Sequence, residues 1–176
     1  DVLVYLPELE GKPVRMPLAP PQAAGPSVRI FGIAWAAKKP MLAASIRVGK
    51  GGALAIFDAE SKRLQPVTMQ KGVEFGKPVL SPDGSVLVVP GKSFVKGDPG
   101  GLLKIDLQSQ NGGLLAKGEF ENVQFSAKGD HILATRVDSA RDKRDIVSID
   151  ISSGDVKQFT TDGGSFNAIY SPTSEQ

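Results

Sequence analysis

A repeat of 45 residues runs through the sequence. The segments AWAAKKPMLAAS, VLSPDGSVLVVP, QFSAKGDHILAT and IYSPTSEQ share one order of an apolar run and a polar turn, and the first three continue into a second apolar run. Aligned on their turns, they place Ala36, Ser81, Ser126 and Ser171 at three successive intervals of 45 residues. A fixed period of this length is typical of repeat architectures, in which each unit buries apolar surface against its neighbours.

Each repeat reads as strands rather than helices. Short runs rich in Val, Ile, Leu and Phe alternate with clusters of Gly, Pro, Asp and Ser, and no segment shows helical periodicity. After each anchor come an apolar strand, a loop, a strand ending in IFD, KID or SID, a short turn and one more strand. Four strands per repeat predict an all-β chain, a β-propeller of four-stranded antiparallel blades.

Turn residues recur at equivalent places in the repeats. Pro82, Asp83 and Gly84 are predicted to form the first hairpin turn of a blade, with the glycine at positive φ, and Gly129 keeps that position in the next repeat. Three further aspartates end the third strand of each repeat, and we expect them to accept backbone hydrogen bonds there rather than to bind calcium around a channel: Asp58, Asp106 and Asp150.

The order SPDG, strand, DIVSID, turn and VKQFTTDG resembles the TolB-like propeller repeat, whose family pattern is close to F-S-P-D-G-x-x-L-A-F followed by D-I-Y-x-x-D and G-x-x-x-x-L-T. Residues 122–163 match best, 72–119 match well, and 28–70 match less because AAKKP replaces SPDG. Residues 1–20 match only the second half of a blade, and 164–176 supply only a first strand of a closing blade. The resemblance implies a ring with more blades, so we expect one domain over 1–176 that is an incomplete ring or part of a larger propeller.

The sequence offers little catalytic chemistry. The only histidine, His131, begins a predicted strand, and one histidine in a chain without cysteine cannot assemble a metal site or a Ser-His-Asp triad. The segments GKSFV and PGKS lack the glycines that a nucleophile elbow or a phosphate-binding loop needs. No catalytic residue, metal or cofactor is therefore predicted. Trp35, on a presumed first strand near the ring axis, is expected to pack in the core.

Bulk charge and hydropathy give no sign of a nucleic-acid partner or of membrane insertion. The net charge is only +2, and no apolar run approaches the length of a membrane helix. The predicted loops between second and third strands are nevertheless charged, and all should emerge on one face of the ring. Their eight cations exceed their three aspartates (Asp98, Asp138 and Asp142) by more than the net charge of the chain, which predicts a basic binding face: Arg47, Lys50, Lys92, Lys96, Arg136, Arg141, Lys143 and Arg144.

Two functions follow from these features. The first is a non-enzymatic scaffold of TolB-like type, exported to the periplasm of a bacterial cell, that docks a protein partner, acidic in charge, on one face of the ring. The second is the non-catalytic propeller domain of a larger hydrolase resembling the prolyl oligopeptidases. Incomplete blades would also leave open strand edges through which the chain associates with itself.

Overall fold

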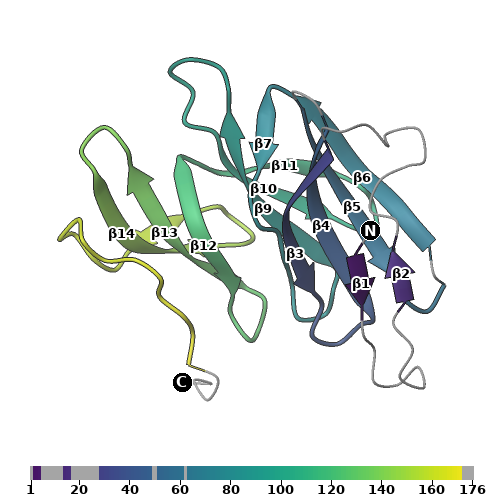
Figure 1. Ribbon diagram of the computed structural model, residues 1–176. Coiled ribbons are helices and arrows are strands. Elements are labelled where there is room, and N and C mark those ends of the chain that lie inside the picture. The colour runs from purple at the N-terminus through teal and green to yellow at the C-terminus, as the bar shows by residue number, and fades with distance from the viewer. Residues whose placement is uncertain (1, 5–13, 17–27, 49–50, 62, 172–176) are drawn as a thin grey trace.

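The structure is a computed structural model that describes residues 2–4, 14–16, 28–48, 51–61 and 63–171. These residues form fifteen strands and no helix. Three antiparallel sheets follow one another in chain order, and their faces pack together (Figure 1). The described residues contain no helix of the length and hydropathy that a membrane crossing requires.

The sheets correspond to successive repeats. The first sheet has the strand order β3 (Val28–Trp35), β4 (Met41–Val48), β5 (Gly51–Asp58) and β6 (Arg63–Lys71). The middle sheet has β7 (Val73–Phe75) and β8 (Val79–Leu80) beside β9 (Val86–Ser93), then β10 (Gly101–Asp106) and β11 (Gly112–Lys117). The third sheet has β12 (Glu119–Phe125), β13 (His131–Asp138), β14 (Lys143–Asp150) and β15 (Val156–Gln158).

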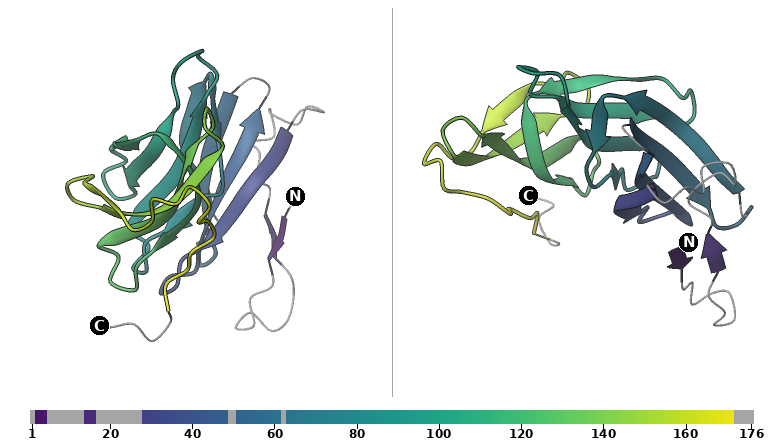
Figure 2. Two further views of the ribbon diagram at one scale, coloured as in Figure 1. Left: turned by 90° about the vertical axis from the view of Figure 1, so that its left-hand side faces the viewer. Right: turned by 45° about the horizontal axis from the view of Figure 1, so that its top comes forward.

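Both ends of the array carry further chain. Strands β1 (Val2–Val4) and β2 (Val14–Met16) pair antiparallel and lie at the β3–β6 end (Figures 1 and 2). Residues 165–171 lie at the opposite end, beside the third sheet, and form no strand. The assignment of 164–176 to the first strand of a further blade therefore stays a prediction.

Two apolar cores join the three sheets. Strand β9 alternates between them, because successive side chains of a strand point to opposite faces. Leu87 and Val89 pack in the core against the first sheet, and Val88 packs in the core against the third. The middle sheet is thus buried on both faces, which is the packing expected of an inner propeller blade.

The predicted hairpin turns are confirmed. Gly84 has φ +69° and its N–H donates to the Ser81 carbonyl oxygen at 2.8 Å. Gly129 has φ +78° and makes the same bond to Ser126 at 3.0 Å. Positive φ is the conformation that glycine adopts without steric cost, so these positions explain why the glycine persists when the proline does not.

The repeated aspartates are structural, as predicted. One carboxylate oxygen of each accepts the N–H groups two and three residues further along the chain. In Asp58 the distances are 2.9 and 3.0 Å, in Asp106 they are 3.0 and 2.7 Å, and in Asp150 they are 2.7 and 2.9 Å. Each aspartate therefore closes the turn between the third and fourth strands of its sheet.

These turns predict a particular response to acid. Hydrogen bonds from the Ser81 and Ser85 side chains and the Ser85 N–H lower the pKa of Asp83 to about 2, and bonds from Ser152 and Ser153 do the same for Asp150. Both values lie below the ordinary pKa of about 3.9, so the stabilisation is complete above that pH and is lost as pH falls toward 2. We expect the urea midpoint to fall over this window, and to fall less steeply in a variant carrying Asp83→Asn and Asp150→Asn. Equal slopes in the parent and the variant would contradict the assignment.

Candidate functional site

The predicted basic residues gather near one edge of the sheets, which we call the loop edge: the ends of β9 and β13, the starts of β10 and β14, and the loops 94–100 and 139–142. Lys96 and Arg141 lie in these loops. Five of the predicted loop cations are instead on strands, because the strands extend further than their sequences indicated: Arg47, Lys92, Arg136, Lys143 and Arg144. Lys50 lies outside the described residues.

An ion pair between neighbouring sheets recurs with the repeat. Arg47 of the first sheet lies 3.1 Å from Glu74 of the middle sheet, and Lys92 of the middle sheet lies 3.6 Å from Glu119 of the third. Both the cations and the carboxylates are 45 residues apart, so the same contact is made twice. Arg47 and Lys92 therefore join adjacent sheets, and an exposed pair of this kind contributes less than about 1 kcal/mol to stability.

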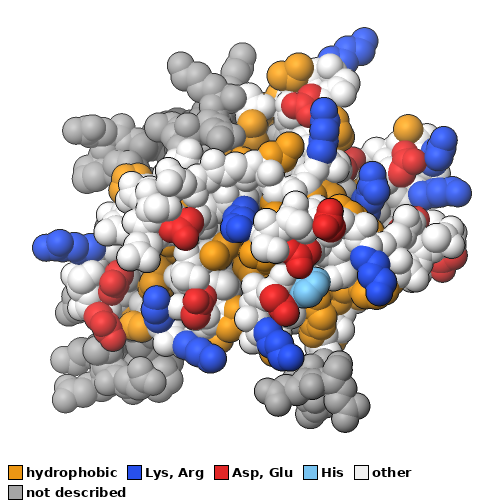
Figure 3. All heavy atoms as spheres, turned by 180° about the vertical axis from the view of Figure 1, so that it is seen from behind, with side chains coloured by type: hydrophobic (Ala, Val, Ile, Leu, Met, Phe, Trp, Pro, Cys, Tyr) orange, Lys and Arg blue, Asp and Glu red, His pale blue; other side chains and the backbone are white. Residues whose placement is uncertain are grey.

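The loop edge is less basic than the loops alone predicted. Arg144 lies 3.9 Å from Glu121 and 3.3 Å from Asp142, and Arg141 lies 3.8 Å from Asp138. Counting the strand carboxylates with the loop aspartates leaves seven described cations facing six acids: Glu74, Asp98, Glu119, Glu121, Asp138 and Asp142. On the face seen in Figure 3, acidic and basic side chains are likewise interspersed, with no large area of one sign.

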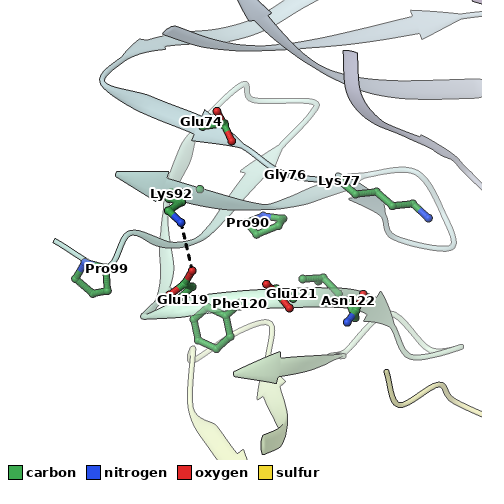
Figure 4. Close-up of a pocket in the computed structure, with 12 residues that line it drawn as sticks. Glu74, Gly76, Lys77, Pro90, Lys92, Pro99, Glu119, Phe120, Glu121 and Asn122 are labelled. Carbon is green, nitrogen blue, oxygen red and sulfur yellow. Dashed lines mark ion pairs between the residues drawn. The ribbon is translucent and has the colours of Figure 1, made fainter. Parts of the chain in front are cut away.

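A cleft of about 370 Å³ opens between the first strands of the middle and third sheets (Figure 4). Glu74, Pro90 and Lys92 line one side of it, and Glu119 and Glu121 line the other. The ion pair between Lys92 and Glu119 spans the cleft (Figure 4). Each of its carboxylates has a cation within 4.0 Å, so the cleft is a polar seam between two blades.

A wider groove of about 990 Å³ lies on the loop edge, between loops 94–100 and 139–142. It brings together three of the predicted binding residues, Arg136, Arg141 and Lys143. Its carboxylates are engaged by donors of the fold itself: Asp98 accepts the Gly100 N–H at 3.1 Å, and Asp145 accepts the Gly163 N–H at 3.0 Å.

The cations of this region are less occupied than its acids. Within the described chain, Lys96, Arg136 and Lys143 form no ion pair. Since the carboxylates are already held by backbone and side-chain donors, the charge that the groove offers to a ligand is positive.

The loop between β9 and β10 presents apolar side chains beside these cations. Phe94 and Val95 are both exposed, and the Arg47 guanidinium lies 5.8 Å from the centre of the Phe94 ring. Sequence reasoning missed these two residues, although an aromatic and a β-branched residue inside a polar loop are the signal that marks them. Aromatic side chains with arginine nearby are enriched in protein interfaces.

Trp35 corrects a prediction. It is on β3, the first strand of its sheet, as expected, but it is 40% exposed rather than packed in the core. It lines a cavity of about 890 Å³ with residues from the first strands of the other two sheets, such as Pro78 and Gln124. The first strands therefore share one cavity, as propeller blades share a central channel.

His131 is half exposed at the start of β13, as predicted. Its Nδ1 lies 3.0 Å from Asp130 and its Nε2 lies 3.7 Å from Asp150. The Ser126 hydroxyl donates to Asp130 at 2.7 Å and not to the imidazole, so the arrangement has no activated serine. Among the described residues, no three metal-ligating side chains are placed to hold an ion.

Three stacked four-stranded antiparallel sheets whose first strands line a common cavity define an incomplete β-propeller. Its fold is that of TolB-like propellers. TolB from Acinetobacter baumannii superimposes with a TM-score of 0.62 at 23% identity, over 78% of this chain and 33% of that one. The sequence matches no protein-family model and no curated protein.

Propellers of proteases are similar as well. The β-propeller domain of the Trilobed protease from Pyrococcus furiosus gives a TM-score of 0.63 at 10% identity, over 76% of this chain and 43% of that one. The acylaminoacyl peptidase of Pyrococcus horikoshii gives 0.59 at 12% identity, over 75% and 25%. This chain spans less than half the length of each of these three proteins.

Proposed function

We propose that this chain is a protein-interaction module of TolB-like propeller type that docks an acidic protein partner on the loop edge. The observation that carries the proposal is the exposed pair Phe94 and Val95 next to a groove whose cations lack partners within the described chain. A buried aromatic anchor surrounded by charge is the usual composition of a binding hot spot. The likeness to TolB supports a periplasmic location for the module.

The contributions of the two features differ in kinetics. Long-range attraction by Lys96, Arg141 and Lys143 would speed the encounter with an acidic partner, whereas burial of Phe94 would slow dissociation. Replacing the three cations by glutamate is therefore expected to lower the association rate about tenfold or more at low salt, with a smaller effect at high salt. Phe94→Ala is expected to raise the dissociation rate about tenfold.

A pull-down from the native source identifies the partner, and surface plasmon resonance then measures both rates. The matched control carries the same charge change away from the loop edge, at Lys39, Lys128 and Lys157, and should bind as the parent does. Melting temperatures should be nearly equal in all variants, because exposed charges contribute little to folding. Retention of every partner by the loop-edge variants would reject this docking surface.

A second candidate is the non-catalytic propeller domain of a larger hydrolase. The likeness to the propellers of the Trilobed protease and of the acylaminoacyl peptidase favours it. An immunoblot of the native source against this chain separates the two candidates. A band of much higher mass that carries peptidase activity supports the hydrolase, and a band without such activity that co-purifies with an acidic partner supports the interaction module.

A further inference from the structure

Residues 165–171, which we call the C-terminal strap, repeat the backbone of a first strand. Asn122, in β12, is one of four non-glycine residues with positive φ in the described chain, at 51°. Asn167, 45 residues later, is another, at 58°. A non-glycine residue with positive φ is uncommon, so its recurrence at the repeat interval indicates that the strap has the shape of the first strand of a fourth blade.

The strap also lies where that strand would lie. Its Asn167 N–H donates to the Thr135 hydroxyl of the third sheet at 3.3 Å, and its Tyr170 N–H donates to Gln124 Oε1 at 3.1 Å. Asn122 and Pro90 line the same cleft between the middle and third sheets. Because Thr135 follows Pro90 by 45 residues, the strap sits against the third sheet as β12 sits against the middle one.

What the strap lacks is its ladder. Strand β12 pairs with β13 along most of its length, whereas no ladder pairs residues 165–171 within the described chain. Phe166 is 59% exposed and Ile169 is 78% exposed. An unpaired strand edge flanked by exposed apolar side chains is a template for addition of another chain.

The opposite end of the array holds the complementary piece. The sequence of β1 and β2 aligns with that of β14 and β15, the two outer strands of the third sheet, and the two pairs are antiparallel in the same way. The chain thus carries the outer strands of a blade at one end and the inner strand at the other. These ends lie at opposite ends of the array and do not meet in one molecule (Figures 1 and 2).

We propose that a second copy of this chain docks head to tail, so that the strap of one copy and the β1–β2 hairpin of the next form one composite blade. The strap already covers the third sheet of its own copy, and the hairpin already lies beside the first sheet of its own copy. The composite blade would therefore bury a sheet face on each side, as the middle sheet does. This interface is separate from the loop edge and does not rest on the proposed function.

Light scattering after gel filtration tests the association. We expect a mass that rises with concentration to about twice the 18.5 kDa of the chain. Phe166→Asp with Ile169→Asp should raise the dissociation constant about tenfold or more, since charges would enter an apolar contact, without changing the melting temperature of the monomer. The matched control is Leu114→Asp, at a side chain that is 60% exposed on the outer edge of the middle sheet, and it should associate as the parent does.

Crosslinking tests the head-to-tail geometry. Because the chain has no cysteine, Leu3→Cys and Ile169→Cys each introduce a single thiol. A short bis-maleimide should link a mixture of these two proteins into a heterodimer, and should link neither protein to itself. A mass of 18.5 kDa at every concentration, or crosslinked homodimers of the Ile169→Cys protein alone, would overturn the proposal.

Discussion

Phe75→Ala is expected to lower the free energy of unfolding by about 3 to 5 kcal/mol, the usual range for removing a phenylalanine from a core. Phe75 is fully buried on the first strand of the middle sheet, in the core shared with the first sheet. Its ring lies so close to Gly52 that a side chain at Gly52 would touch it at 2.7 Å. The substitution would leave a cavity between two sheets that the rigid strands on either side cannot fill.

Urea unfolding followed by intrinsic fluorescence measures this loss. Phe159→Ala serves as the control, because Phe159 is exposed beyond β15, and it should change the free energy by no more than about 0.5 kcal/mol. A loss below about 1 kcal/mol for Phe75→Ala would show that the first two sheets are not packed as described.

Gly100→Ala is expected to cost about 3 kcal/mol or more, through two separate effects. Gly100 has φ +76°, where an alanine is strained, and its Cβ would lie 2.0 Å from the Gly91 carbonyl oxygen. Both atoms belong to the backbone around the loop between β9 and β10, so neither can move aside as a flexible side chain can.

Gly97 supplies the control within the same loop. It has φ +83°, but no atom lies within 4 Å of the position that a Cβ would take. Gly97→Ala should therefore show only the conformational effect, about 1 kcal/mol. The difference between the two variants in thermal unfolding isolates the steric effect, and equal losses would contradict the close approach of Gly100 to Gly91.

The fold could be predicted from the sequence because its signals are local. The glycines at 84 and 129 and the aspartates at 58, 106 and 150 act on backbone within a few residues, so their roles follow from the repeat alone. Strand ends were placed less well. Pro90 and Gly91 indicated a loop, yet both continue β9, because pairing with β10 extends past them.

The candidate site was only partly predictable, because it is assembled from different repeats. Glu74 and Glu119 lie on first strands, far from the loop cations in sequence, and the packing of neighbouring sheets brings them to Arg47 and Lys92. Their 45-residue spacing was the available signal. The exposure of Trp35 had no such signal, since it depends on what faces the first strand of the first sheet.

The repeated ion pair gives the array a direction. The middle sheet presents Glu74 to the sheet before it and Lys92 to the sheet after it, so its two faces carry opposite charges at equivalent places. A unit turned end for end would set carboxylate against carboxylate and ammonium against guanidinium, and juxtaposed like charges are unfavourable. Units of this kind can be duplicated in tandem but not inverted, so growth by gene duplication lengthens the array along one axis and preserves its polarity.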